Sequence, residues 1–411
     1  MIDPSDREAL RGAWQAYCET LREEGERIIS GDAGDARDPQ ELAEALRAVA
    51  RIGIMSLQHR MDFNDPDFPT FFRALDDRYK YGAPDAHITY LQTTVRGDAT
   101  YRIHAEHHGR IFNVNPRWNQ NVALWSPRLA PNPDGSYDVT MSAEQQSGNW
   151  LELDPAFRGD EGVPGTFPMA DGGVVVRSYY WDWEDERPPG FFYIERVDAA
   201  APAYPAPLTP SRFGAQLRGA TELLRKAAQW WIARSVNVRR QSVPNEMAPP
   251  NPVPPGVTNW KAPQNTPINY GTCCWDLGPD EALYIESELP DGPHWSFQIV
   301  NAWWEAPDQQ NRQGSIGHLQ AHIDNDGRFR GVVAHQDPGV PNWLDTGESR
   351  RGFLWYRWFQ PREKQPVPVC RVVKFSELRS LFPSEHPQID AATRKAQLAV
   401  RREHLARRFQ G

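Results

Sequence analysis

Between residues 270 and 375 the chain is a succession of short runs of alternating or apolar residues, each closed by turn-forming residues. The runs are Glu281–Glu288, Trp295–Trp304, Ile316–Ile323, Phe329–His335, Phe353–Phe359 and Val372–Phe375. A period of two is typical of strands with one buried face, and the Asp-Gly pair that ends Asp324–Gly327 favours the positive φ angles of a tight hairpin. Short strands separated by turns in this way predict a β-sandwich or jelly roll.

A second β region precedes this one. His87–Val95 and Tyr101–Ile103 flank a short loop, and Val174–Tyr180 and Phe191–Glu195 flank a charged turn that ends in Gly190. Both pairs of runs have the length and composition of hairpin strands.

Helices are predicted outside the β regions, where apolar residues recur at helical spacing. The predicted organisation is a helical segment at 1–80, a first β-sandwich region at 81–205, a connector helix and proline-rich linker at 206–264, a second sandwich at 265–378 and a basic helix at 379–411. The expected fold class is therefore mainly β with flanking helices (α+β). The basic helix is expected to be a solvated docking helix or an oligomer contact, so a homo-oligomer is one open alternative.

Composition narrows the possible partners and the compartment. The formal net charge of −9 disfavours binding to nucleic acid. The sequence contains no long apolar run, so neither a signal peptide nor a membrane span is predicted. The four cysteines, Cys18, Cys273, Cys274 and Cys370, are too scattered for a disulfide framework in a chain of this size. We therefore expect a cytoplasmic protein with a small-molecule partner and no cofactor.

One candidate site lies where the predicted strand at 329–337 ends. If that segment is extended, His335 and Asp337 share one face and can exchange a proton. Asp345 supplies a second carboxylate on the loop that follows, so the predicted catalytic residues are His335, Asp337 and Asp345.

The predicted substrate-binding residues are Asn301, Trp303, Asn342, Trp343 and Arg357. They offer amides, aromatic walls and a guanidinium for a polar group of the substrate. The structural alternative stays open: the carboxylates cap turns, Asn342 bonds to backbone, Trp343 seals an edge of the sandwich, and Arg357 neutralises Asp337 or Asp345.

Metal binding is a further alternative at two alternating segments. His104, Glu106 and His108 alternate onto one face of a predicted strand and form a common ligand set. His318, Gln320 and His322 alternate in the same way but lack a recognisable third ligand. A solvated strand face explains the His318 pattern equally well, and a polar outer face is the commoner meaning of the alternation at His104.

Several of these segments together resemble a known family. Trp295–Gln298, Asn301–Glu305, the Asp324–Gly327 turn, His335–Thr346 and Arg357–Trp358 resemble the bacterial family called domain of unknown function 1214, over roughly residues 265–360. Tyr180–Trp183 is similar to the segment that often precedes that domain. The resemblance implies a β-sandwich or jelly-roll fold with no agreed reaction, and it transfers no catalytic residue.

The leading expectation is a cofactor-independent enzyme that acts by acid–base chemistry on a small, largely apolar, ring-containing or terpenoid-like molecule. The reaction would be a hydration, dehydration, isomerisation or hydrolysis, with His335 moving the proton. The alternatives are a non-catalytic module that binds a carbohydrate or protein, and metal-assisted catalysis in the first sandwich.

Overall fold

The computed structural model describes residues 3–73, 75–76, 78–116, 122–155, 173–187, 190–251 and 268–408. The chain divides into two compact units: unit 1 comprises residues 1–79, 88–179 and 189–233, and unit 2 comprises 80–87, 180–188 and 234–411. Two short segments, 80–87 and 180–188, thus belong with the C-terminal half of the chain although strands of unit 1 flank them.

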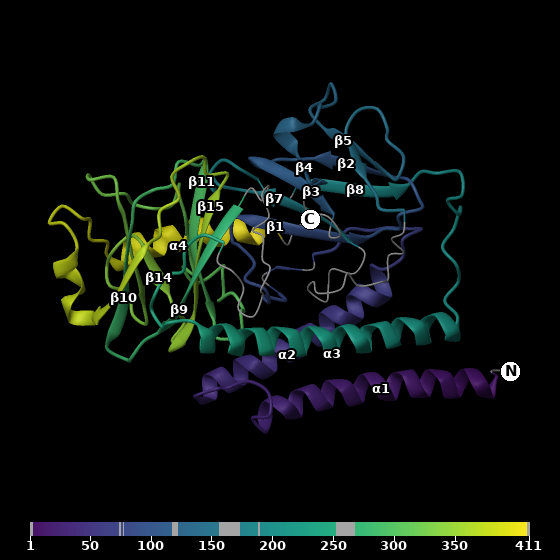
Figure 1. Cartoon of the computed structure of the whole chain (residues 1–411), viewed down its shortest axis with the longest axis horizontal. Helices are drawn as coiled ribbons and strands as arrows, with labels where there is room; N and C mark the ends of the chain where they lie inside the picture. The colour runs from purple at the N-terminus through teal and green to yellow at the C-terminus, as the bar shows by residue number, and fades with distance from the viewer. Residues whose placement is uncertain are drawn as a thin grey trace. The chain divides into compact units, whose positions relative to one another are not determined.

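Unit 1 begins with two helices, α1 (Pro4–Ile29) and α2 (Pro39–Asp62), labelled in Figure 1. Each helix has an aspartate N-cap and a proline in its first turn, which are strong start signals. The hydroxyl of Tyr17 on α1 donates to the carbonyl of Gly53 on α2 at 2.8 Å and joins the two helices. A third helix, α3 (Pro210–Gln241), begins in unit 1 and ends in unit 2.

The strands of unit 1 form two four-stranded sheets, in the orders β1-β7-β3-β4 and β6-β5-β2-β8. Their bounds are β1 (Ile88–Thr94), β2 (Tyr101–Glu106), β3 (Ile111–Pro116), β4 (Leu124–Trp125), β5 (Tyr137–Ser142), β6 (Trp150–Glu152), β7 (Gly173–Tyr179) and β8 (Phe191–Arg196), with a 3₁₀ turn η2 at Ser126–Arg128. Ile103 of β2, Val114 of β3 and Val176 of β7 share one buried core. Because that core takes side chains from both sheets, the sheets pack face to face as a sandwich.

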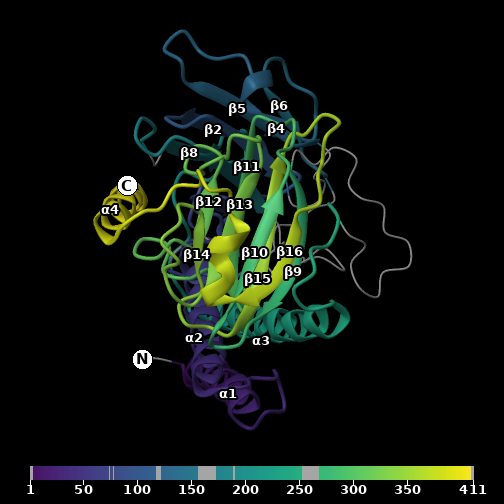
Figure 2. The same cartoon turned by 90° about the vertical axis from the view of Figure 1, so that its left-hand side faces the viewer.

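Unit 2 repeats this plan, with sheets in the orders β14-β13-β10-β16 and β12-β11-β15-β9. The elements are β9 (Ile268–Asp276), β10 (Glu281–Ser287), β11 (His294–Asn301), β12 (Ser315–Gly317), β13 (Phe329–Ala334), β14 (Trp343–Asp345), β15 (Arg351–Phe359), β16 (Val369–Lys374), the 3₁₀ segment η3 (Phe375–Leu381) and α4 (Ala391–Arg407). Ile285 of β10 and Phe297 of β11 lie in the same core, and Figure 2 shows α4 beside the strands of this unit. The predicted mainly β fold with flanking helices is confirmed.

Some predicted strand ends are wrong. The strand predicted at 316–323 stops at Gly317, where the amides of Gln320 and Ala321 both donate to the carbonyl of Gly317 and form a turn. The strand predicted at 295–304 stops at Asn301. The proline-rich linker predicted around 248–256 falls largely outside the described residues.

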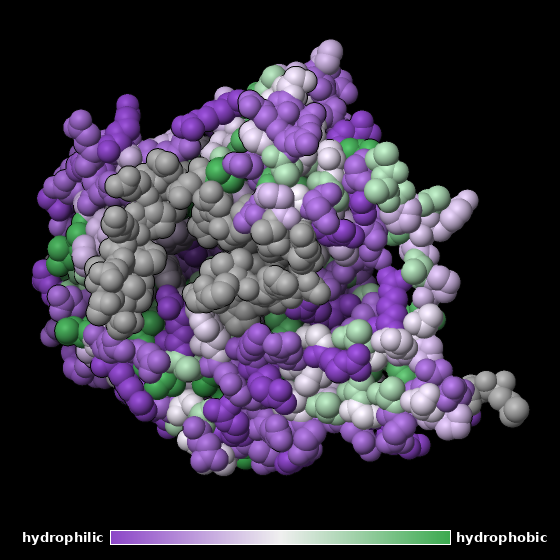
Figure 3. Space-filling model, turned by 45° about the vertical axis from the view of Figure 1, so that its right-hand side comes forward, coloured by the Kyte–Doolittle hydropathy of each residue, from purple (hydrophilic) through white to green (hydrophobic). Residues whose placement is uncertain are grey.

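No helix in the described part of the chain is long and apolar enough to span a membrane. On the face shown in Figure 3, the coloured residues are mostly hydrophilic, and the hydrophobic ones form small scattered groups. Scattered apolar residues are normal on a protein surface and do not by themselves mark a docking site.

Candidate functional site

The predicted catalytic residue His335 lies directly after β13, at the edge of a cavity of about 340 Å³. Its Nδ1 lies 2.9 Å from the hydroxyl oxygen of Thr346. Asp280, Glu281 and Lys374 line the same cavity, and the lysine forms ion pairs with both carboxylates. The carboxylates that line this cavity with His335 thus already have a cationic partner.

Asp337 does not pair with His335, because the strand ends at Ala334 and the two residues no longer alternate on one face. Its Oδ2 accepts from Nε of Arg394 at 2.9 Å, and its Oδ1 accepts from the amide of Gly339 at 2.9 Å. The predicted orienting role of Asp337 is therefore corrected to an ion pair and a turn cap.

Asp345 has the same kind of partners as Asp337. One of its oxygens lies 3.0 Å from Nη1 of Arg312, and the other accepts from the amide of Gly347 at 2.9 Å. Both predicted carboxylates thus adopt the structural alternative that the sequence left open.

Asn342 and Trp343 also bond to the backbone. The side chain of Asn342 accepts from the amide of His322 at 2.9 Å and donates to the carbonyls of His322 and Arg330 at 2.7 and 2.8 Å. The indole of Trp343 donates to the carbonyl of Ala334 at 3.0 Å. Asn342 therefore holds two backbone segments together, and Trp343 fastens β14 to β13.

The remaining predicted binding residues are buried in unit 2. Oδ1 of Asn301 accepts from the amides of Trp303 and Glu305, both at 3.0 Å, so this side chain closes a turn. Trp303 is only 1% exposed. Arg357 bonds to Gln298 at 2.7 Å and lies 3.4 Å from Asp85, so its anionic partner is neither Asp337 nor Asp345.

The metal ligands predicted in unit 1 do not gather. Nδ1 of His104 lies 2.9 Å from Asp138, and its Nε2 lies 3.7 Å from Glu106. β2 ends at Glu106, so the alternation that would bring His108 onto the same face does not continue. His104 therefore has carboxylate partners but forms no three-ligand group with Glu106 and His108 in the part of the chain described here.

A buried histidine–aspartate pair, not predicted from the sequence, lies in unit 2. Nδ1 of His87 lies 2.9 Å from Oδ1 of Asp85, and the two side chains are 0% and 2% exposed. Nε2 of His87 lies 2.9 Å from Oε1 of Gln320. The amide nitrogen of Gln320 donates to the carbonyl of Trp181, which orients its oxygen toward His87. Both partners of His87 thus present a hydrogen-bond acceptor to the ring.

Stacked rings surround His87. Its ring lies 4.9 Å from that of Trp183 and 5.3 Å from that of His294. Trp183 stacks in turn on His404 at 5.3 Å, and His294 stacks on Trp181 at 4.9 Å and 7°. These five rings form a column in which the imidazole of His87 lies between the indole of Trp183 and the imidazole of His294.

Burial and charge set the protonation of these groups. Burial alone would raise the pKa of Asp85, but the charge of Arg357 and the hydrogen bonds and charge of His87 outweigh it and hold that pKa well below its ordinary value. Burial also lowers the pKa of His294 well below its usual range and that of His404 to about 2, and the charge of His87 adds to both effects. His294 and His404 are therefore neutral near pH 7.

A cavity of about 360 Å³ lies beside this group. Its lining combines carboxylate, amide, hydroxyl, guanidinium and apolar side chains: Asp182, Trp183, Glu184, Gln313, Ser315, Ile316, Leu319, Gln320, Gln397, Val400 and Arg401. Its volume is within the range of small-molecule sites. Trp183 and Gln320 belong to both the cavity wall and the surroundings of His87.

Helix α4 contributes Gln397, Val400 and Arg401 to the cavity wall, and three arginines spaced seven residues apart attach this segment to unit 2. Arg394, Arg401 and Arg408 lie over the rings of Trp343, Trp183 and Tyr180, at 5.2, 5.1 and 6.0 Å. All three arginines are buried and donate to backbone carbonyls. The sequence predicts a solvated docking helix or an oligomer contact here, but these three residues are buried and not solvated, because carbonyls and ring faces take the place of water.

Residues 281–363 match the model of a protein family described as "Protein of unknown function (DUF1214)". This match confirms the resemblance indicated by the motifs around Trp295, Asp324 and His335. No curated protein matches the chain.

Two solved structures are similar to the chain. An uncharacterised protein from Burkholderia cenocepacia is 27% identical, with a TM-score of 0.75, and the alignment covers 90% of this chain and 99% of that one. The VPA0106 protein from Vibrio parahaemolyticus is 13% identical, with a TM-score of 0.42, and the alignment covers 80% and 98%. The first shares the fold of this chain, whereas the second likeness is too low to support an argument.

Proposed function

We propose that the cavity lined by Trp183 and Gln320 is the active site of an enzyme that performs acid–base chemistry on a small ring-containing molecule, with His87 as the proton-transferring group. The observation that carries the proposal is the hydrogen bond between Nε2 of His87 and Oε1 of Gln320, since Gln320 lines the cavity. One amide side chain therefore separates the imidazole from a bound ligand.

The surroundings of His87 suit proton transfer. Asp85 orients the ring through Nδ1, and Arg357 keeps that carboxylate charged. A rotation of the Gln320 side chain exposes Nε2 to the cavity, where it can give a proton to a substrate oxygen and take it back later. An imidazole held by a carboxylate in this way is the commonest general acid–base arrangement in enzymes.

The cavity lining specifies the substrate class further. The ring of Trp183 lines the cavity although it is already stacked with His87 and His404, and Ile316 and Leu319 add apolar contacts for a ring. The amide of Gln397 matches hydroxyl or carbonyl groups better than a wholly apolar molecule, whereas the amide nitrogen of Gln313 already donates to the carbonyls of Pro341 and Trp343. The proposed substrate is thus a ring compound that carries hydroxyl or carbonyl groups, and its chemistry at this cavity needs no cofactor.

The same lining supports a second candidate function, non-catalytic binding of a carbohydrate. The apolar side chains of Ile316 and Leu319 beside the amide of Gln397 suit a sugar ring, with apolar contact on one side and hydrogen bonds at its edge. In this candidate function the ligand binds in the cavity and His87 takes no part. Experiments that measure binding and turnover separately therefore distinguish the two candidate functions.

Binding is tested with cyclic alcohols, cyclic ketones and monosaccharides as probes, by ligand-observed NMR. Val400→Trp fills the cavity from a residue that is 40% exposed, and it should weaken binding of any probe at least about tenfold. Val369→Trp is the matched control, because Val369 is 63% exposed on β16 and does not line the cavity. Equal binding by wild type and Val400→Trp contradicts the assignment of the cavity.

Catalysis is tested by following the bound probes for product with the same method. His87→Gln should bind a probe as the wild type does. Its turnover rate should be lower by about a hundredfold or more, the usual contribution of a general acid–base group. Gln320→Ala should keep turnover, because the amide covers the imidazole without transferring the proton. Circular dichroism verifies that both variants fold. Binding without turnover in the wild type would favour the carbohydrate-binding candidate.

A further inference from the structure

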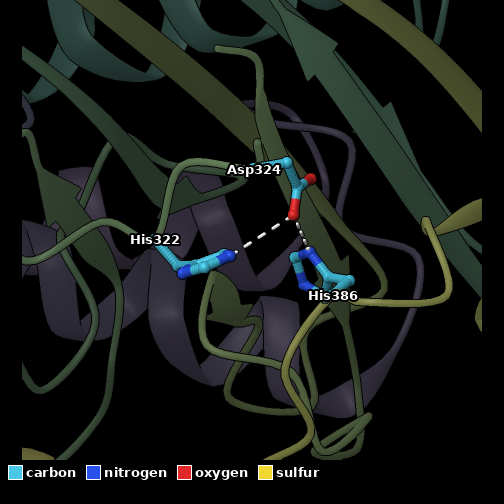
Figure 4. A group of neighbouring side chains, drawn as sticks. All are labelled: His322, Asp324 and His386. Carbon is cyan, nitrogen blue, oxygen red and sulfur yellow. Dashed lines mark hydrogen bonds and ion pairs between the residues drawn. The ribbon is translucent and has the colours of Figure 1, made fainter. Parts of the chain in front are cut away.

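Three potential metal ligands meet in unit 2, in a group that the proposed function does not use: His322, Asp324 and His386. Figure 4 shows both imidazoles directed at the same carboxylate oxygen. Nδ1 of His386 lies 2.7 Å from Oδ1 of Asp324, and Nε2 of His322 lies 3.3 Å from it. One ligand atom from each residue lies within 4.8 Å of the others.

We infer that His322, Asp324 and His386 bind a divalent first-row transition-metal ion. Two imidazoles and one carboxylate are a ligand set used by zinc and by non-haem iron. When an ion lies about 2.1 Å from each ligand atom, the ligand atoms lie about 3.0–3.4 Å from one another. The two distances to Oδ1 of Asp324 come within this range when the side chains move by a few tenths of an ångström.

Local chain geometry brings two of the ligands together. His322 and Asp324 lie two residues apart, on either side of Ile323, which forms a bridge with Phe329 in the hairpin. In an extended segment such residues project to the same side. His386 comes from the segment after η3, where its amide donates to the carbonyl of Pro383 in a turn.

Residues around the ligands hold them in place, as the outer shell of a metal site does. Asn342 bonds to both the amide and the carbonyl of His322 and fixes its backbone. Arg330 donates to Oδ2 of Asp324 at 2.8 Å and leaves Oδ1 to the imidazoles. This arrangement favours coordination through one carboxylate oxygen.

The hydrogen bonding of the His386 ring is one-sided. Nε2 of His386 is buried and has no hydrogen-bond partner among the described residues, so protein contacts satisfy this ring at one nitrogen only.

Access to the group is one-sided. Asp324 and His386 are 5% and 2% exposed, whereas the side chain of His322 is 34% exposed. An ion held by three protein ligands with one side open to solvent keeps positions for water or another ligand, as metal ions in catalytic sites do.

The test uses full-length, tag-free protein treated with chelator and then titrated with Zn²⁺ by calorimetry and with Co²⁺ by visible absorption. The wild type should bind one ion per chain. His322→Ala and Asp324→Asn should each weaken binding by about a hundredfold or more, beyond the 10- to 100-fold usual for outer-shell changes. Circular dichroism verifies that both variants fold.

The control is His104→Ala, which removes a histidine that pairs with two carboxylates in unit 1 without being part of a three-ligand group. It should bind as the wild type does. The inference is overturned if the wild type binds no ion in stoichiometric amount, if both His322→Ala and Asp324→Asn bind as tightly as the wild type, or if His104→Ala alone loses the ion.

Discussion

Oε1 of Gln320 lies 2.9 Å from Nε2 of His87, and Gln320 is at the same time part of the cavity wall beside Trp183. The buried imidazole is therefore one side chain away from any ligand in that cavity. His87 is itself 0% exposed, so reaction at its ring requires Gln320 to move. Lids and side chains that open a site in this way are common in enzymes.

Gly317 is predicted to be irreplaceable beside His87. A Cβ atom added there would overlap Nε2 of His87 and lie 2.7 Å from Oε1 of Gln320. Gly317→Ala should therefore lower the free energy of unfolding by about 1–3 kcal/mol, the usual cost of overpacking. Urea denaturation checks this. Gly12→Ala is the control, because a Cβ at that helical position meets nothing within 4 Å and should be neutral or stabilising.

The stability of the protein should fall as the pH drops below about 6.5, the ordinary pKa of histidine. Folded His404 stays neutral down to about pH 2, so between these values the unfolded chain binds one more proton than the folded chain. Each such histidine costs about 1.4 kcal/mol per pH unit. His294, whose pKa is also lowered by burial, adds to the slope.

The variant His404→Phe isolates this contribution. The variant keeps a ring against Trp183 and removes the titrating group. The free energy of unfolding should therefore fall less steeply between pH 6 and 4, by about 1.4 kcal/mol per pH unit, the contribution of one proton. Urea denaturation at several pH values measures the slope. Identical slopes in the variant and the wild type would show that His404 binds a proton in the folded state.

Arg401 is predicted to attach α4 to unit 2 through its planar fork of donors. It donates to the carbonyls of Gln309 and Ser315 and to the hydroxyl of Ser315, and it lies over Trp183. Arg401→Lys should cost about 1.5–3 kcal/mol of stability, because a lysine cannot satisfy these acceptors together. Hydrogen exchange of the α4 amides should rise.

The neighbouring residue Arg402 supplies the control for Arg401. It is exposed and donates to Asn311 at 2.9 Å. Arg402→Lys should change stability by less than about 0.5 kcal/mol. An equal effect of the two substitutions would contradict the role given to the buried arginine.

Asp337 is expected to serve stability and not chemistry. It pairs with Arg394 of α4, whose side chain is 6% exposed, and removing its charge leaves that guanidinium short of a partner. Asp337→Asn should lower the free energy of unfolding by about 1–2 kcal/mol. It should leave probe binding unchanged in the NMR experiment. Loss of binding with full stability would instead restore Asp337 to an active site.

Local sequence patterns predicted most of the fold. The runs at 281–288 and 329–335 became β10 and β13, and the Asp-Gly turn has Gly327 at φ +77°, as the hairpin requires. β14, which is three residues long and pairs in parallel with β13, was missed because so short a strand leaves no period in the sequence.

The candidate site could not be predicted in the same way, because its residues meet only through the tertiary fold. Asp85 and His87 lie two residues apart, but Gln320 is 233 positions from His87. Likewise His386 lies 62 positions from Asp324. The candidate residues chosen from the sequence were those that lie a few positions apart. No local pattern indicates which distant side chain will join such residues in the folded protein.

The arginines of α4 illustrate the same limit. Their spacing of seven residues, at 394, 401 and 408, is visible in the sequence. The sequence analysis drew nothing from this spacing and predicted a solvated docking helix or an oligomer contact, since arginines are seldom fully buried. The carbonyl and ring partners that allow burial come from other parts of unit 2, so the spacing alone could not reveal them.

The most direct test of the proposed active site is a crystal structure of the protein with the probe that binds most tightly in the NMR experiment. We expect electron density for the probe in the cavity beside Trp183, with Gln320 rotated and Nε2 of His87 within hydrogen-bond distance of a probe oxygen. Electron density for the probe beside His335, in the cavity lined by Asp280 and Lys374, would contradict the assignment of the active site to His87 and would support the site predicted from the sequence.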